Sequence, residues 1–316
     1  MQTIGIGISV PRKESPDKVT GSVKYNTDFI SPELLYAWMV TSLYAHAEIK
    51  AIDCTEAFKI RGVHAVITGD SCDFLYGPMI EDRPPIARGK VRYFGEPVAV
   101  VVADSEEKAK EAAGKVMVEY SPLPVINSPS AAMKEESPLI HERLAFYKHV
   151  RPNEIFPRPG TNIAQHIKIR KGDMKTGWGK SEVIVKSQLN LPQSDHIAME
   201  PRNVRAEIEG DGRVVIHTSS QAPFYVQKIL SYSFNLDDTK VTVHVPLVGG
   251  GFGGKTTAQL EIIAYLASRA VNGRPVKLVE SREQDMTSSP CNLGMEAIVK
   301  IGSTKDGKYR PLNLPL

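Results

Sequence analysis

Runs of apolar residues divide the first part of the chain into short strands and helices. Residues 98–103 are apolar at six consecutive positions, a pattern typical of a strand buried on both faces. Asp104 and Ser105 follow as candidate N-caps of a helix that extends to Lys115. The remaining predictions for this part are strands at 35–42, 48–53, 64–68 and 116–120 and a short helix at 55–60. Together these elements predict a compact α/β unit.

A second set of strands and helices follows residues 126–160, which are rich in proline, serine and charge and which we interpret as a linker. Residues 204–209 and 214–219 predict a hairpin across an intervening Gly-Asp-Gly turn. Further strands are expected at 164–171, 182–191, 241–248, 276–279 and 295–301, and helices at 221–231 and 258–270. The last stretch, 309–316, contains two prolines, which restricts it to the edge of a sheet.

These patterns predict an α+β protein in four parts. An extended lead-in (1–18) precedes the α/β unit (19–125), the linker (126–160) and a second domain (161–316) that looks incomplete. A chain of 316 residues is long enough for two ordinary domains.

Composition and charge narrow the range of functions. The net charge is +3, from 39 basic and 36 acidic residues, without a long basic run, so we expect neither nucleic-acid nor membrane binding. No apolar run reaches membrane-spanning length. The three cysteines, at positions 54, 72 and 291, are too far apart for zinc or iron–sulfur spacing or a disulfide framework. A cytoplasmic location is therefore expected.

A glycine-rich loop, residues 248–256, lies between a predicted strand and a predicted helix. Five of the six positions from 249 to 254 are glycine, and such a loop presents main-chain N–H groups to an anion. Phe252, the one large residue among them, is expected either against a flat ligand or in the core. Gly249 to Thr256 also fits the phosphate-loop pattern G-x-x-x-x-G-K-[ST]. Only about 60 residues follow it, however, and a nucleotide-binding core generally needs several further βα units.

A second interpretation of the loop comes from a resemblance to the xanthine dehydrogenase/aldehyde oxidase family. Residues 20–28 and 94–99 resemble the opening and the G-E-x-V-A strand of the family's hammerhead domain. Residues 196–201 and 219–221 resemble the family's H-x-x-M-E-P segment and S-x-Q turn. Residues 248–255 and 272–276 resemble the family's G-G-G-F-G-G-K loop and the stretch after the next helix. The resemblance covers residues 5–308 and implies an α/β hammerhead domain followed by the first part of a molybdopterin-binding α+β domain.

The resemblance also implies a cofactor and the residues that would hold it. Family members bind molybdopterin, often as its cytosine dinucleotide, and the pterin dithiolene holds the molybdenum. Carried over, Gln221 would hydrogen-bond the molybdenum oxo ligand. The loop residues Gly250, Gly251, Phe252 and Gly253 would lie over the molybdenum and the pterin, with main-chain N–H groups as donors.

The activity implied is that of a molybdenum hydroxylase, which oxidises a purine, an N-heteroaromatic or an aldehyde with water as the oxygen source. Xanthine-specific members carry a glutamate after the loop lysine, where this chain has Thr256, so xanthine itself is a doubtful substrate. Electrons would leave through a small [2Fe-2S] subunit and an FAD subunit of a hetero-oligomer.

The family's general base is a glutamate in a later G-x-G-E motif, and this chain shows neither that motif nor the F-R-G segment. We therefore expect the chain to be inactive alone, with no catalytic residue assigned within it. The rest would come from a second polypeptide, or the chain would be a truncated product, which we favour.

Two other functions stay open. One is a phosphate-loop nucleotide-binding protein that uses Gly249 to Thr256. The other is a non-catalytic fragment that binds partner subunits, which predicts an exposed apolar surface. We expect structural roles for several further polar residues: Glu96 in a turn, His196 and Glu200 near the loop, and Lys255 packed or paired at the helix start. Arg202 and Arg205 are predicted to lie on a solvated face or in subunit contacts.

Overall fold

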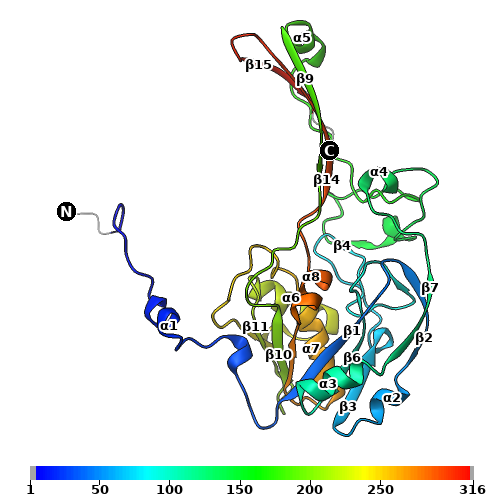
Figure 1. Cartoon of the computed structure of the whole chain (residues 1–316), viewed down its shortest axis with the longest axis vertical. Coiled ribbons are helices and arrows are strands. Elements are labelled where there is room, and N and C mark those ends of the chain that lie inside the picture. The colour runs from blue at the N-terminus through cyan, green and yellow to red at the C-terminus, as the bar shows by residue number, and fades with distance from the viewer. Residues whose placement is uncertain (1–4, 314–316) are drawn as a thin grey trace.

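The computed structural model describes residues 5–313, and its body is built on one mixed sheet of seven strands (Figure 1). Their order across the sheet is β12 (Val241–His244), β11 (Val214–Thr218), β10 (Asn203–Ile208), β13 (Val276–Val279), β1 (Leu35–Thr41), β6 (Pro97–Ala103) and β3 (Val63–Thr68). The β1–β13 and β11–β12 pairs are parallel, and the other pairs are antiparallel.

Strand β6 shows why the sequence folds this way in its first half. All seven of its residues are buried, as the continuous apolar run predicts, because β1 and β3 flank it and other elements cover both faces. The predicted helix follows as α3 (Glu106–Ala113). Its N-cap is Ser105, whose hydroxyl accepts a hydrogen bond from the Lys108 N–H at 3.3 Å.

Helix α7 (Gln259–Ala270) is the central helix of the body, with its first ten residues buried. It packs against the sheet and near α6 (Pro223–Phe234), and it ends where Asn272 and Gly273 adopt positive φ values of 59° and 83°. One apolar core contains Leu35 and Met39 of β1 together with Ile262 of α7. The predicted division into domains stays a prediction, but the sheet and this core run across its boundary.

A smaller sheet and a covering segment complete the body. The sheet has the order β5 (Lys90–Val91), β2 (Ala47–Asp53) and β7 (Met117–Pro122), and α2 (Thr55–Phe58) follows β2. Residues 126–160, interpreted from the sequence as a linker, contain α4 (Pro129–Ala132) and β8 (Lys148–His149), which pairs with β4 (Ile80–Glu81). Leu144 and Ile155 of this segment pack on Ile80, so the segment is anchored to the body.

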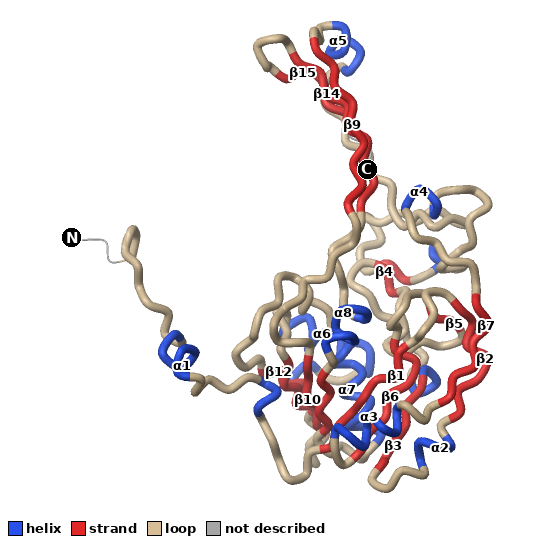
Figure 2. The backbone as a smooth tube through the Cα atoms, in the orientation of Figure 1, coloured by secondary structure: helices blue, strands red, loops and turns tan. Residues whose placement is uncertain are grey.

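A narrow arm projects from the body (Figures 1 and 2). It is a sheet of β15 (Tyr309–Asn313), β14 (Met295–Ser303) and β9 (Val183–Leu191), with α5 (Met174–Gly179) near its tip. The proline-containing strand β15 lies at the edge, as predicted. All nine residues of β9 are exposed, including five large apolar ones.

Several sequence predictions are wrong in detail. The lead-in contains a short helix, α1 (Ser15–Thr20), and residues 164–171 form no strand; residues 1–4 and 314–316 lie outside the described part. Strand β12 ends at His244, because the chain then turns towards the first part of the chain, where Leu247 forms an isolated bridge with Tyr25. Helix α8 (Arg282–Ser288) was not predicted. Short 3-10 turns occupy Asn26–Asp28, Gly69–Ser71, Leu144–Phe146 and Asp238–Lys240. Within residues 5–313, no helix is long and apolar enough to cross a membrane.

Candidate functional site

The glycine loop between β12 and α7 has an unusual backbone. Gly250 and Gly253 have φ values of 101° and 97°, which glycine tolerates at no steric cost. Phe252 has φ 52°, a conformation that is uncommon and strained for a bulky residue. Its side chain is 74% exposed, so the alternative that places this ring in the core is wrong. The loop therefore holds a large aromatic ring outside the body at a conformational cost.

The side chain of Gln221 reaches this loop from the turn before α6. Its Oε1 accepts hydrogen bonds from the N–H groups of Gly253, at 3.0 Å, and Lys255, at 3.3 Å, and its own main-chain N–H donates to the Lys255 carbonyl at 2.8 Å. A Cβ on Gly251 would lie 2.5 Å from Cδ of Gln221, so a larger residue there would displace the Gln221 amide. The structure thus brings Gln221 and the loop together. That they bind a cofactor stays a prediction.

This arrangement leaves a group of free hydrogen-bond donors. Within the described part of the chain, the main-chain N–H groups of Gly250, Gly251 and Phe252 have no hydrogen-bond partner, and neither does the Nε2 amide of Gln221. Successive N–H groups in such a turn form a concavity that favours an anion. A polar, negatively charged group is therefore the kind of ligand that this side of the loop can bind.

Glu200 and Lys255 fix the two ends of the loop. Oε2 of Glu200 accepts a hydrogen bond from the Gly249 N–H at 2.8 Å and pairs with Nζ of Lys255 at 2.8 Å. Its Oε1 accepts from Nδ2 of Asn203 at 3.2 Å. The Lys255 side chain is only 3% exposed, so its paired, structural role is confirmed. Because this ammonium faces a carboxylate rather than the open side of the loop, the geometry disfavours a phosphate loop.

Residues 195–199, which precede β10, pack against the glycine loop. His196 packs under it, because a Cβ on Gly254 would lie 2.9 Å from Nδ1 of His196. Ile197 has φ 44°, a strained value for a β-branched residue, and its N–H donates to Oδ1 of Asp195 at 2.7 Å. From α8, Arg282 donates to the carbonyls of Ala198 and Met199 at 2.7 and 2.8 Å. His196 thus has the structural role expected of it.

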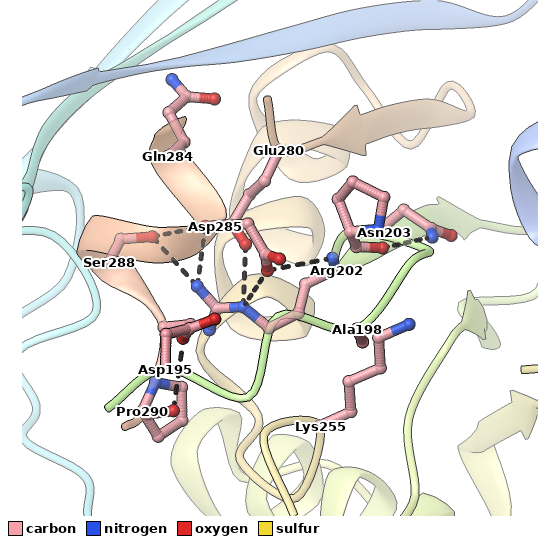
Figure 3. Close-up of polar contacts among 12 residues, drawn as sticks. Asp195, Ala198, Arg202, Asn203, Lys255, Glu280, Gln284, Asp285, Ser288 and Pro290 are labelled. Atoms are coloured by element: carbon pink, nitrogen blue, oxygen red, sulfur yellow. Dashed lines mark hydrogen bonds and ion pairs between the residues drawn. The ribbon is translucent and has the colours of Figure 1, made fainter. Parts of the chain in front are cut away.

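Arg202 lies in a buried polar network, and its prediction as a solvated or subunit-contact residue is wrong (Figure 3). Its Nε lies 2.8 Å from Oε2 of Glu280, and its Nη2 donates to Oε1 of Glu280 at 2.8 Å and to Oγ of Ser288 at 2.9 Å. Its main-chain N–H and its Nε also contact Oδ1 of Asp285, at 3.2 and 3.4 Å. Burial raises the pKa of Glu280 to about 7, although Arg202 opposes the shift.

Sequence reasoning missed α8, which supplies two partners of Arg202, Asp285 and Ser288, and the Arg282 side chain that binds the Ala198 and Met199 carbonyls. The signal was present: Ser281 and Gln284 form a capping box, the S-x-x-Q spacing that starts a helix. Thr256, where the resemblance implies a glutamate in xanthine-specific members, is exposed, and its hydroxyl donates to the Gly253 carbonyl at 2.9 Å. Glu96 has the structural role in a turn that was expected, since its Oε2 accepts from the Arg92 N–H at 2.5 Å.

Comparison with known proteins identifies both parts of the chain. Residues 20–124 match the family model described as the aldehyde oxidase and xanthine dehydrogenase a/b hammerhead domain. Residues 155–314 match the molybdopterin cofactor-binding domain. A probable xanthine dehydrogenase subunit of Bacillus subtilis is 31% identical over 95% of this chain, which spans 38% of that protein.

Two further proteins show the same relationship. The nicotinate dehydrogenase large molybdopterin subunit of Eubacterium barkeri is 28% identical over 98% of this chain and 69% of its own length. The solved structure of reconstituted CO dehydrogenase from Oligotropha carboxidovorans superposes with a TM-score of 0.84 at 27% identity, over 98% of this chain and 39% of that one. The chain therefore belongs to the xanthine dehydrogenase/aldehyde oxidase family and is related to its molybdopterin-binding subunits.

Proposed function

We propose that this chain is the molybdopterin-holding part of a molybdenum hydroxylase that oxidises a purine, an N-heteroaromatic or an aldehyde with oxygen from water. The observation that carries the proposal is the set of free donors on one loop, the N–H groups of Gly250, Gly251 and Phe252 beside the Gln221 amide. The names of its relatives, which include a nicotinate dehydrogenase and a probable xanthine dehydrogenase subunit, support the substrate classes.

The geometry suits a molybdenum cofactor with oxygen ligands. Oε1 of Gln221 is occupied by two N–H groups, so Nε2 is left to donate to an oxo ligand. The N–H groups of Gly250, Gly251 and Phe252 would bind the negatively charged ligands of the metal and the pterin. Gly253 differs from Gly250, Gly251 and Phe252 because its N–H donates a hydrogen bond to Oε1 of Gln221. This hydrogen bond orients the Gln221 side chain.

When bound, the cofactor would supply the redox chemistry, and this chain would bind it, orient it and exclude water from it. The exposed ring of Phe252 and the exposed side chains of Ile197, Met199 and Phe224, from segments that adjoin the loop or Gln221, would form an apolar surround. Thr256 offers no carboxylate to a purine, which favours other substrates over xanthine. The proton-accepting glutamate would come from a portion of the large subunit not represented in this sequence.

The proposal extends to partners and to the form of the cofactor. We propose a hetero-oligomer in the cytoplasm with a small [2Fe-2S] subunit, an FAD subunit and the remainder of the large subunit, and molybdopterin in its cytosine dinucleotide form. The name of one relative, the carbon monoxide dehydrogenase large chain of Afipia carboxidovorans, supports the part of this proposal that concerns a multi-subunit assembly.

Co-expression with the neighbouring genes, followed by molybdenum and pterin analysis, tests the proposal. The assembled protein should contain both, and Gln221→Ala should lower the molybdenum content, whereas Glu33→Ala, at an exposed position before β1, should not. A folded, complete assembly without pterin would refute the proposal. Tight Mg-ATP binding that is lost in Lys255→Ala would instead support a phosphate loop. The buried Lys255–Glu200 pair predicts no such binding.

A further inference from the structure

A second polar cavity, of about 160 Å³, shares no residue with the glycine loop. Its walls come from the residues after β4, the turn between β5 and β6, and the segment that covers them, and include Asp82, Arg83, Pro84, Arg92, Glu96 and Ile140. A space of this size has room for about five waters or one small organic molecule. The chain therefore encloses a site large enough for a ligand at a distinct place in the fold.

Neither arginine of this cavity forms a direct ion pair with a residue from 5 to 313, although Asp82 and Glu96 lie on the same walls. The Arg83 guanidinium lies beside the Tyr76 hydroxyl, and its Cζ is 5.8 Å from the centre of the Tyr93 ring. Arg92 donates only to carbonyls, from Nε to Ile140 at 3.2 Å and from Nη1 to Lys90 at 3.3 Å. A carboxylate ligand in the cavity would supply the direct ion pair that both guanidinium groups lack.

The remaining walls restrict the charge and shape of the anion. Asp82 and Glu96 line the same cavity, and burial raises the pKa of both carboxyl groups, that of Glu96 to about 7. Where either carboxyl group is ionised, a ligand with two negative charges would meet more repulsion than a monoanion. His141 adds no positive charge at neutral pH, because burial and the nearby Arg92 lower its pKa to about 4. Pro84 and Ile140 provide apolar contacts for a short hydrocarbon tail.

We propose that this cavity binds a small monocarboxylate, whose carboxylate pairs with the guanidinium of Arg83 while its short apolar tail contacts Pro84 and Ile140. Arginine suits the role because its planar fork matches both oxygens of a carboxylate. This inference does not depend on the molybdopterin proposal, since the two sites have no residue in common.

Titration of the protein, in the assembly in which it is isolated, tests the site. Sodium propionate is the probe, and sodium chloride at equal ionic strength is the control. Inorganic phosphate is a second ligand that tests whether the cavity accepts a dianion. Calorimetric heats and the melting temperature should both saturate with propionate. Arg83→Gln should weaken binding by about tenfold to a hundredfold, the loss expected for a hydrogen bond between charged groups. Arg88→Gln, at a nearby exposed arginine, should bind like the wild type.

Three outcomes would overturn the proposal. The first is an absence of saturable propionate binding to the wild-type protein, a result that requires no variant to fold. The second is equal binding by Arg83→Gln and wild type. The third is saturation by phosphate but not by propionate, which would assign the cavity to a different class of anion. If Arg83→Gln does not fold, Arg83→Lys, which keeps the charge but not the planar fork, should fold and bind propionate more weakly than wild type.

Discussion

The glycines of the loop are restricted either by a close neighbour or by their backbone conformation. Gly249 lies against Glu200, since a Cβ there would be 2.6 Å from Cβ of Glu200, and Gly251 lies against Gln221 at 2.5 Å. Gly250 and Gly253 need positive φ instead. The glycine pattern predicted the loop, and the family resemblance implied that Gln221 and the loop belong to one site. The sequence could not predict that Gly253 donates to Gln221 while the three preceding N–H groups stay free.

The contact between Gly251 and Gln221 can be tested by adding one methyl group. Gly251→Ala would place a Cβ 2.5 Å from Cδ of Gln221 and displace the amide. We expect the molybdenum content of the assembled protein to fall about tenfold, as for the loss of a good hydrogen bond. Gly210→Ala is the matched control, because nothing lies within 4 Å of the Cβ it adds. Equal metal content in the two variants would contradict the geometry proposed for the site.

Glu200→Gln tests the contacts by which Glu200 holds both ends of the loop, with the Gly249 N–H and with Nζ of Lys255. The amide keeps the size of the carboxylate but leaves the buried Nζ of Lys255 without a counter-charge. We expect the free energy of unfolding to fall by about 3 kcal/mol, at the lower end for breaking a buried ion pair. Chemical denaturation measures it. Glu48→Gln, which breaks the exposed pair with Lys50, should cause no measurable loss, and a similar effect in both variants would show that the Glu200 contacts contribute little.

At the scale of elements, local patterns predicted what local interactions determine. The buried strand β6, the Ser105 cap of α3 and the β10–β11 hairpin were all predicted, because sequence neighbours set them. Arg202 was assigned to the wrong environment because its partner Glu280 lies 78 positions further along the chain. Strand pairing over such separations is set by packing, so a strand at 164–171 could not be excluded from alternation alone.

The turn between β5 and β6 makes stability depend on pH through Glu96. Burial raises its pKa from 4.5 to about 7, so the folded state binds a proton more tightly than the unfolded state. Stability from this group is fully present below pH 4.5 and is lost as the pH rises to about 7. Glu96→Gln should therefore reduce the fall in unfolding free energy over that range, measured by denaturant titration at each pH. The control Glu33→Gln, at an exposed position, should leave the pH dependence of the unfolding free energy unchanged. An unchanged pH dependence in Glu96→Gln would contradict this account.

At the scale of the whole molecule, the two halves of the chain share one sheet. Leu35 of β1 pairs in parallel with Val276 of β13, and both contribute to the same core. No local signal could predict this pairing, which is why the sequence suggested two separate units. The arm also depends on pairing between distant segments. Strands β9 and β14 were predicted, but their pairing with each other, which builds the projecting arm, was not (Figure 2).

The exposed apolar residues of the arm predict a contact in the assembled protein. We expect the proposed remainder of the large subunit to cover β9, so Val185→Lys should reduce its co-purification with this chain. Val125→Lys is a control of similar exposure, 60% against 56% for Val185. Quantitative pull-down from cells that express both polypeptides measures the effect. Undiminished recovery with Val185→Lys would show that the arm is not the contact.

The central claim is that the free donors of the glycine loop face a molybdenum cofactor. A cryo-electron microscopy structure of the complete assembly tests it most directly. The account predicts cofactor density against the N–H groups of Gly250, Gly251 and Phe252, with Nε2 of Gln221 within hydrogen-bond distance of an oxo ligand. Cofactor density elsewhere, with Gln221 and the loop facing only protein or solvent, would contradict it.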